Sequence, residues 1–572
     1  MMERVKNRIN KWSIAGFAVI LFLVFSIFST TAKAASEPIV IKDFNDLFVF
    51  AQASQGYDYQ GKTIVLENDI EITEIDQAML DKYGIKHLTI GNKDLPFKGT
   101  FDGQGHTIRG LKYDTYIIKD ANSGLFSFIE NATIQNLIVE DADLDCIFQG
   151  GVVVGHAQSS TLKNITVLNS KLHISPANNV VSLVTNGGFS GGGIAGIIED
   201  TMMYNCEVSG TEIVNNSTSA ITGVGGEGLY MGGLVGWASG SNIEYCRARA
   251  NYTGESENKE LKNTIVRNDY DVVVGALGGK SVYAGGIVGG VNHGTSIIDC
   301  FSTAEVSFDV ANYVAVGSGI AGYAGGITGA LRGESQINRC HYAGNIYSKQ
   351  YNAILVIPII QHNVNINGIT RIREDNSLVM NSYFKPSAIK SGVSISAVGG
   401  EDDNITRGAK DDKTYTDIEF WEGQDYDFIG NKNRNSIQNN TEHYNKWVMD
   451  YDLGIPVHGS SVMATFDFPN VGKVSMNETA LVHKKVETSD PLNFAIQGIH
   501  PREKQQVTLE MTLEDNENYR LTGWYKKTLV EEHRLPDMQK LLEITTNEEL
   551  KVNQGISPIT LSIQDRDLFV AE

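Results

Sequence analysis

The sequence predicts an all-β protein that winds as a β-solenoid, in which short strands form coils that stack on one another. A glycine-rich segment recurs along the chain and is followed several times by a cysteine at nearly constant spacing. The runs between these segments alternate apolar and polar residues and are rich in β-branched side chains, which is typical of half-buried strands. Glycine is abundant, at 58 of 572 residues, and proline is scarce, at 11. Repeats of this kind bury an apolar face by stacking on their neighbours.

Residues 1–35 have the pattern of a signal peptide. Basic residues precede the apolar run IAGFAVILFLVF, and Ala32-Lys33-Ala34 fits a cleavage site. The alternative is a retained membrane anchor, because the run approaches the length of a membrane span. We expect cleavage after Ala34, no membrane span afterwards, and a secreted or cell-surface (extracellular) protein.

The charge and the cysteines exclude several classes of function. The net charge is −21, which disfavours nucleic acid and anionic membranes as partners. The five cysteines are an odd number, so a full disulfide framework is not expected in an exported protein. No C-x-x-C pair occurs, so the sequence predicts no zinc or redox site.

Four of the cysteines occupy one position of the repeat. Each follows the last glycine of a glycine pair by 13 or 14 residues. Weaker copies of the repeat place Leu137, Ile165 and Ser382 at the same position. A position that accepts Leu, Ile, Cys or Ser faces the core, where free cysteine behaves as a small apolar side chain. We therefore predict a buried row rather than a metal or catalytic site, formed by Cys206, Cys246, Cys300 and Cys340.

The glycines are expected where each coil bends sharply and where its backbone lies close to the next coil. Some repeats are longer than one coil requires. Their extra residues are polar, as in Tyr252 to Asp271, and we expect them to form loops that leave one face of the solenoid.

The elements follow in a simple order. Residues 36–115 should form an N-terminal cap and the first rungs, with a helix from about Phe44 to Ala53 that covers the open edge of the first coil. Residues 116–400 hold the repeats. Residues 401–460 should close the last coil, and residues 461–572 lack the glycine repeat and should form a small C-terminal β-rich module. The closing segment would pack through Phe420, Trp421, Phe428 and Trp447.

Two stretches resemble known families. LTIGNKDLPFKGTFDGQGHTIRGL (Leu88 to Leu111), followed by repeated GG-I/L-x-G and I-x-x-C segments, resembles bacterial GLUG-motif surface proteins over about residues 38–457. The resemblance implies a right-handed parallel β-helix and a role in adhesins or other large extracellular proteins. Thr512 to Lys527 and Ile559 to Glu572 resemble the internalin-type bacterial repeat, with Gly523-Trp524 at its G-W pair.

The sequence predicts no catalytic, cofactor-binding or metal-ligating residue. The polygalacturonase motifs would need paired aspartates before the histidine, whereas Asp402-Asp403 follows Asn292-His293-Gly294 and Arg371-Ile372-Arg373. Asp411-Asp412 lies in a hydrophilic stretch, Asp102 should bind turn amides, and His106 and His156 should be rung or surface residues. The sequence contains no H-E-x-x-H and no P-loop, and we expect no serine elbow.

We therefore expect an exported, non-enzymatic adhesin or ligand-presenting β-helix. Its partner would be a host glycan, a matrix protein or a cell-wall polymer. One alternative is a β-helix polysaccharide lyase or glycoside hydrolase, which would carry a groove with clustered acids and a basic residue from neighbouring coils. Another is the non-catalytic part of a larger secreted peptidase.

Overall fold

The computed structural model describes most of the chain up to residue 398 and separate strands after it. The described ranges are 37–82, 88–113, 122–146, 149–174, 189–215, 218–222, 228–253, 260–275, 281–312, 322–352, 365–388 and 396–398, followed by strands between residues 444 and 571. The expected signal peptide and the aromatic residues Phe420, Trp421 and Phe428 lie outside the described residues.

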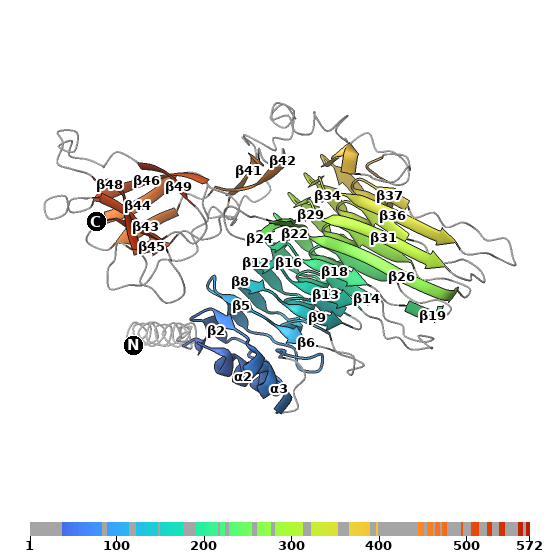
Figure 1. Cartoon of the computed structure of the whole chain (residues 1–572), viewed down its shortest axis with the longest axis horizontal. Helices are drawn as coiled ribbons and strands as arrows, with labels where there is room; N and C mark the ends of the chain where they lie inside the picture. Colours follow the sequence, from blue (N-terminus) through green and yellow to red (C-terminus); the bar gives the residue numbers. More distant parts are fainter. Residues whose placement is uncertain are drawn as a thin grey trace, which may run out of the picture.

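The N-terminal helical cap is confirmed, and its helix α2 (Phe44–Ala53) has the expected bounds. The Asp43 carboxylate caps the helix by accepting a hydrogen bond from the Asp46 N–H at 3.0 Å. Phe44, Leu47, Phe50 and Ala51 form its buried face. A second helix, α3 (Glu74–Lys82), follows β3 and was not expected. Figure 1 shows both helices at one end of the stacked coils.

Phe50 anchors α2 on the first coils. Its ring centroid lies 4.8 Å from that of Tyr59, and 6.2 Å from those of Phe97 and Phe101. These rings fill the end of the core, so the helix covers apolar side chains that the first coil would otherwise expose.

The body is a parallel β-helix, as predicted, and each complete coil contributes strands to four sheets. One coil consists of β10 (Gln149–Gly151), β11 (Val154–Gln158), β12 (Thr161–Leu168) and β13 (Lys171–Ile174). Each of these strands pairs in parallel with the equivalent strand of the next coil. Figure 1 shows the strands stacked along the length of the solenoid.

The four sheets are numbered here in the order in which one coil visits them. Sheet 1 contains β10, β14 (Phe189–Gly192), β20 (Leu229–Gly232), β27 (Val282–Gly285), β32 (Gly322–Gly325) and β37 (Asn365–Asn367). Sheet 2 contains β7 (Phe126–Glu130), β11, β15 (Ala195–Glu199), β21 (Val235–Ser239), β28 (Val288–Asn292), β33 (Thr328–Leu331) and β38 (Thr370–Arg373).

Sheet 3 bends along its length, so most coils contribute two short strands each. It contains β1 (Ile39–Ile41), β2 (Thr63–Leu66), β3 (Ile70–Glu71), β4 (Thr100–Asp102), β5 (Thr107–Arg109), β8 (Thr133–Glu140), β12, β16 (Met202–Tyr204), β17 (Glu207–Ser209), β22 (Asn242–Glu244), β23 (Arg247–Arg249), β29 (Ser296–Ile298), β30 (Phe301–Ser302), β34 (Gln336–Asn338), β35 (His341–Tyr342), β39 (Leu378–Met380) and β40 (Tyr383–Phe384). Sheet 4 contains β6 (Lys112–Tyr113), β9 (Asp143–Cys146), β13, β18 (Glu212–Asn215), β19 (Thr218–Thr222), β26 (Ile265–Gly275), β31 (Glu305–Asn312) and β36 (Ile346–Asn352).

The bend in sheet 3 falls at one left-handed residue per coil, which comes directly before the residue of the buried row. In the first of these coils asparagines occupy it, and their side chains form a ladder. The Asn164 Nδ2 donates to Asn136 Oδ1 at 2.9 Å, and the Asn205 Nδ2 donates to Asn164 Oδ1 at 2.9 Å. Asparagine tolerates positive φ better than most residues, so the corner and the ladder favour the same side chain. The residues at this corner are Asn136, Asn164, Asn205, Tyr245, Asp299, Arg339 and Asn381, with φ from 49° to 54°.

The predicted cysteine row is confirmed. Cys206, Cys246, Cys300 and Cys340 are all fully buried, and the residues that follow them pair coil by coil in sheet 3. The fifth cysteine, Cys146, is buried in sheet 4, opposite Ile174. The row therefore lines the core of the solenoid.

The repeated glycines are required because adjacent coils touch. A Cβ atom on Gly286 would lie 2.2 Å from the carbonyl oxygen of Gly326 in the next coil. A Cβ atom on Gly289 would lie 2.4 Å from the backbone nitrogen of Met231 in the preceding coil. The glycine pair therefore lies against the next coil, and the third glycine lies against the preceding coil. Both contacts require glycine, which explains why the motif recurs as a unit.

The stretch from Tyr252 to Asp271 is only partly the loop that we expected. β24 (Asn251–Thr253) and β25 (Glu260–Lys262) form an antiparallel hairpin outside the four sheets. Residues from Ile265 onward belong to β26 and pair with β18 and β31 inside sheet 4. The loop prediction was wrong there because the run IVRNDYDVVVG has strand periodicity despite its charged residues.

The C-terminal part is β-rich, as predicted. A 3₁₀ helix (Pro386–Ala388) follows β40, and β41 (Tyr444–Asp450) and β42 (Ile455–Ser461) form an antiparallel hairpin. The remaining strands form two antiparallel sheets: β43 (Ala464–Phe468), β44 (Gly472–Asn477), β46 (Gln505–Leu513) and β49 (Ile559–Ile563), and β45 (Asn493–Ala495), β50 (Leu568–Ala571), β47 (Gly523–Thr528) and β48 (Asp537–Glu543).

Candidate functional site

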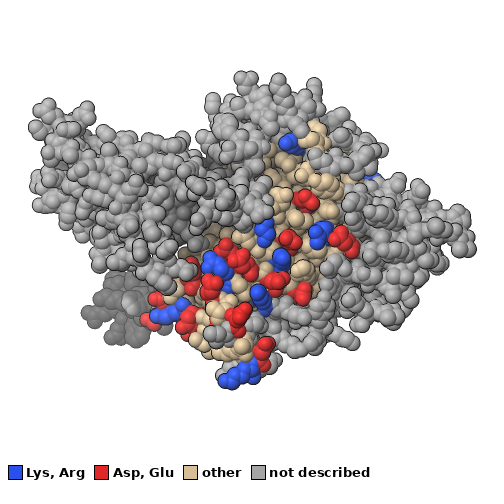
Figure 2. Space-filling model, in the orientation of Figure 1, with Lys and Arg blue, Asp and Glu red and all other residues tan. Residues whose placement is uncertain are grey.

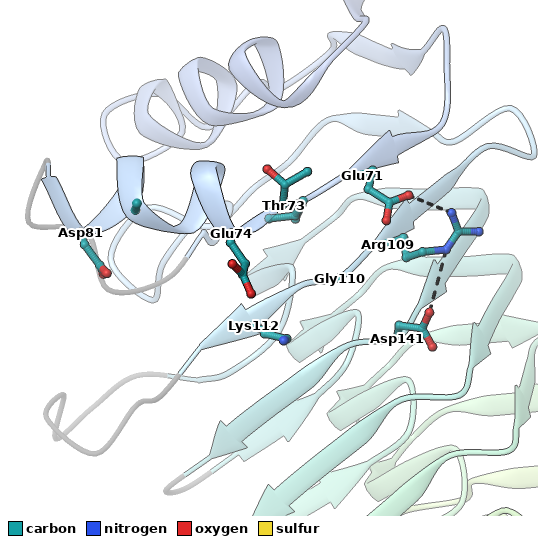
Figure 3. A pocket seen from close by; sticks show the side chains of 10 residues that line it. Glu71, Thr73, Glu74, Asp81, Arg109, Gly110, Lys112 and Asp141 are labelled. Atoms are coloured by element: carbon teal, nitrogen blue, oxygen red, sulfur yellow. Dashed lines mark hydrogen bonds and ion pairs between the residues drawn. The ribbon is translucent and has the colours of Figure 1, made fainter. Parts of the chain in front are cut away.

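A polar pocket of about 460 Å³ lies between α3 and the first coils (Figure 3). Its position follows from the unexpected helix, which leaves a hollow beside the edges of sheets 3 and 4. The lining carries both signs of charge, which come from neighbouring coils. The charged lining residues are Glu71, Glu74, Asp81, Arg109, Lys112 and Asp141.

Arg109 occupies this pocket as the centre of an ion cluster. Its Nη1 lies 3.0 Å from Glu71 Oε2, and its Nη2 lies 2.7 Å from Glu140 Oε2. The hydrogen bond to Glu140, followed in size by the opposing effect of burial, leaves the pKa of Arg109 above its ordinary value. Burial, and then repulsion from Glu140, raises the pKa of Asp141. The ion pairs of Arg109 join adjacent coils. Because its guanidinium keeps its proton in this cluster, Arg109 is a poor general base.

A row of aromatic side chains lies on the outer surface of sheets 1 and 2. We call Tyr230, Trp237, Tyr283 and Tyr323 the aromatic strip. The Tyr230 and Tyr283 rings stack at 4.9 Å and 9°, and the Tyr283 and Tyr323 rings stack at 5.3 Å and 17°. Trp237 lies beside Tyr230 at 4.5 Å and 50°. Tyr230, Trp237 and Tyr323 are partly exposed, whereas Tyr283 is 7% exposed.

The backbone repeat places these rings. Tyr230, Tyr283 and Tyr323 pair in register on β20, β27 and β32, so the coil rise alone brings their rings into stacking distance. The small residue Gly290 leaves room for the rings beside it. A Cβ atom there would lie 2.8 Å from the Tyr230 ring and 3.0 Å from Trp237.

Two arginines lie at the end of the aromatic strip that is nearest the last coil. The Arg332 guanidinium lies 4.9 Å from the centre of the Tyr283 ring, and its Nη2 donates to the Tyr283 hydroxyl at 3.0 Å. Its Nε donates to Glu374 Oε2 at 2.8 Å, so its charge is compensated. Arg371 interacts electrostatically with Tyr323, and burial lowers the pKa of Arg371.

A second aromatic row lies on sheet 3, but β42 covers it. His458 makes edge-on ring contacts with Tyr245 and Phe301, at 5.8 Å and 5.0 Å. Its Nε2 lies 2.6 Å from the Asp299 carbonyl oxygen, and His341 Nε2 lies 2.7 Å from the Pro456 carbonyl oxygen. These contacts are with the flank of three coils, whereas we had expected the segment 401–460 to cover the last coil.

The residues considered from the sequence do not assemble into one site. Asp102 accepts a hydrogen bond from the Gln104 N–H in its turn at 2.8 Å, as expected. His106 lies 3.1 Å from Asp69, and His156 lies 3.2 Å from Glu199. Asn292-His293-Gly294 and Arg371-Ile372-Arg373 lie two coils apart, because β28 pairs with β33 and β33 with β38. Asp402-Asp403 and Asp411-Asp412 lie outside the described residues.

The described residues contain no group of three or more His, Cys, Asp or Glu side chains that could hold a metal ion. Within the same part of the chain, no helix has the length and apolar character needed to cross a membrane. Figure 2 shows one face of the molecule, where positive and negative side chains are interspersed over the first coils.

The aromatic strip was not predicted, although the sequence carries a signal for it. A tyrosine precedes the glycine pair in YMGG, YAGGIVGG and YAGGITG, at Tyr230, Tyr283 and Tyr323. A side chain that recurs at an outward position of a solenoid forms a row on its surface, just as an inward one forms a row in the core.

The comparisons with known proteins leave the family open. No family model matches the chain, and no curated protein matches it. A solved structure described as "IgA1 Protease" is similar with a TM-score of 0.33 and 14% identity, over 60% of this chain and 22% of that one. The chain therefore spans about a fifth of the length of that protein, and a likeness at this level says nothing of activity or ligand.

Proposed function

We propose that the chain is an exported, non-enzymatic β-helix protein, secreted or held at the bacterial cell surface, that binds a carbohydrate polymer along the aromatic strip. The observation that carries the proposal is the in-register stack of Tyr230, Tyr283 and Tyr323, with Trp237 beside it. The polymer would be a host glycan or a cell-wall polymer.

The chemistry of the strip suits such a ligand. Tyrosine and tryptophan combine an apolar body with a polar tip, and they present large contact areas at low cost in conformational entropy. Because the three tyrosine rings stack on one another, their faces are largely covered and their edges point outward. Successive coils rise by about 4.8 Å, which is close to the length of one sugar unit in an extended polysaccharide. The partly exposed rings of Tyr230 and Tyr323 can therefore each meet a sugar, two units apart, whereas Tyr283 between them is nearly buried.

The test is binding of the purified mature protein to arrays of host glycans, cell-wall polymers and matrix proteins. Tyr323→Phe keeps the stack and removes the hydroxyl of a partly exposed ring, and Trp237→Ser removes the ring at the end of the strip. We expect both variants to bind the same glycan more weakly than the wild type. Tyr57→Ser, at a tyrosine in the cap that is 49% exposed, serves as the control and should bind like the wild type. Binding to matrix proteins alone, or to no ligand, would contradict the proposal.

A polysaccharide lyase is the second candidate, and one observation favours it. Arg371, whose pKa burial lowers, interacts electrostatically with Tyr323, and a lyase needs a basic group and a proton donor beside an acidic sugar. Incubation with uronic acid polymers decides between the two candidates. Unsaturated products that absorb in the ultraviolet, lost in Arg371→Gln, would favour the lyase over the binding protein.

A further inference from the structure

Arg371 breaks the repeat at a position where the preceding coils have glycine. The pairing of Thr328 with Thr370 and of Ala330 with Ile372 places Arg371 opposite Gly329. The equivalent residues of the four coils before that one are Gly155, Gly196, Gly236 and Gly289, and the coil that precedes these four has Ser127. A large charged side chain there departs from the packing rule of the fold, and such departures are expected at functional positions.

The surroundings of this position show where the arginine side chain lies. At Gly329 a Cβ atom would lie 2.8 Å from the backbone nitrogen of Ala284, which follows Tyr283 in sheet 1 of the preceding coil. Arg371 has the equivalent position in the next coil, so its side chain extends towards Tyr323, which is the equivalent of Tyr283. The positive charge of Arg371 interacts with Tyr323. The guanidinium therefore lies at the corner between sheets 1 and 2, at the end of the aromatic strip.

The positive charge of Arg371 lacks a carboxylate partner among the described residues. Its contact is a long one, from Nη1 to Asn367 Oδ1 at 3.5 Å, and its buried Nε atom has no hydrogen-bond acceptor in the described part of the chain. By contrast, Arg332 beside it is paired with Glu374. A buried donor without an acceptor costs free energy, and an anionic ligand would relieve that cost.

We propose that Arg371 binds an acidic group of the carbohydrate, a carboxylate or sulfate carried by the sugar that contacts Tyr323. This inference rests on the proposed function and names the substrate class of the same site. A guanidinium donates two parallel hydrogen bonds to either group, and the ring edge of Tyr323 would contact the sugar that carries it. The aromatic strip then binds the chain of the polymer, and Arg371 selects acidic polymers over neutral ones.

The test measures binding of the full mature chain to two matched pairs of polymers. Polygalacturonic acid is compared with its methyl ester, and dextran sulfate with dextran, so that each pair differs only in the acidic group. We expect the wild type to bind at least one acidic polymer about ten- to a hundredfold more tightly than its neutral partner. Which pair shows the difference tells carboxylate from sulfate.

Two variants show whether Arg371 is responsible. Arg371→Gln should remove most of that preference and reduce the dependence of binding on salt. Lys42→Gln also removes one positive charge, from an exposed pair with Glu67 in the cap, and should leave the preference intact. Equal binding of acidic and neutral polymers, or an unaltered preference in Arg371→Gln, would overturn the inference. The proposed function would survive that result, whereas the absence of any glycan binding would remove both.

Discussion

The backbone N–H of Cys246 lies 3.4 Å from the Sγ atom of Cys300, one coil further along the solenoid. The Cys300 N–H has the same relationship with Cys340 Sγ, also at 3.4 Å. Each thiol in turn points at a carbonyl oxygen of its own coil, as Cys300 Sγ does at Ile298, at 3.3 Å. The row is therefore a ladder of weak hydrogen bonds inside an apolar core. At the bend of sheet 3, the thiols of Cys300 and Cys340 take the place of a backbone carbonyl as hydrogen-bond acceptors.

The thiols should be unreactive in the folded protein. All five cysteines are buried and none forms a disulfide, and burial raises the pKa of the Cys300 thiol. Because the thiolate is the reactive form, a disulfide reagent should modify none of them in native buffer and all five in denaturant. Rapid modification of the native protein would show that the row is open to solvent.

Cys300→Ser should be tolerated better than Cys300→Ala. Ser382 already occupies the same position of the last coil, where its Oγ accepts the Cys340 N–H at 3.2 Å. The hydroxyl of Cys300→Ser can accept the Cys246 N–H in the same way. Alanine leaves that N–H unsatisfied and opens a small cavity, so we expect a loss of about 1–3 kcal/mol in the free energy of unfolding. Denaturant unfolding of the two variants compares them, and equal stability would contradict the hydrogen-bonding role.

Gly286→Ala should prevent normal stacking of two coils. The new Cβ atom would lie 2.2 Å from the Gly326 carbonyl oxygen and 2.5 Å from Ser302 Oγ. The first of these is backbone, so the coils must separate, and we expect a loss of at least about 3 kcal/mol or an insoluble protein. Gly56→Ala is the matched control, since its Cβ would meet only the Ala53 oxygen at 3.9 Å. Thermal unfolding checks both, and similar melting temperatures would refute the argument.

The asparagine ladder should contribute to stability in two ways. Asparagine tolerates the left-handed backbone at the bend, and its side chain makes hydrogen bonds to the neighbouring coils. Asn164 has φ of 52° and joins Asn136 to Asn205 by two hydrogen bonds of 2.9 Å. Asn164→Gly removes the bonds but suits the left-handed backbone, and we expect a loss of about 1–3 kcal/mol. Asn164→Ala should lose about 1 kcal/mol more, because alanine is strained in that conformation. If the alanine variant is as stable as the glycine variant, the corner is not strained.

His341 should make the protein less stable in acid. Burial lowers its pKa from 6.5 to about 3, so the unfolded chain takes up the proton before the folded one does. The contribution of His341 to stability is complete above pH 6.5 and is lost as the pH falls from 6.5 towards 3. The upper limit of that loss is about 4–5 kcal/mol.

Denaturant unfolding between pH 4 and pH 7 measures this effect. His341→Gln cannot be protonated, and its amide can still donate to the Pro456 carbonyl oxygen, which His341 Nε2 reaches at 2.7 Å. The variant should therefore show a flatter dependence of stability on pH than the wild type. Parallel pH profiles would assign acid sensitivity to other groups.

The parts of the fold that were predictable are those that local spacing encodes. The apolar residues of α2 recur at helical spacing behind the capping residue Asp43, and the four cysteines recur at one position of the repeat. Such patterns indicate which side chains face the core, because every coil repeats the same geometry. The positions of the helix and of the buried row could therefore be inferred from the residues alone.

The candidate site depended on which coils lie side by side and on what covers them. Asp299 and His458 are 159 residues apart in the chain, yet they meet because β42 lies along the flank of the coils. Tyr283 and Arg332 meet because coils of different lengths align in register. Such contacts join residues that no local pattern relates, so they emerge only when the core is packed and the strands are paired.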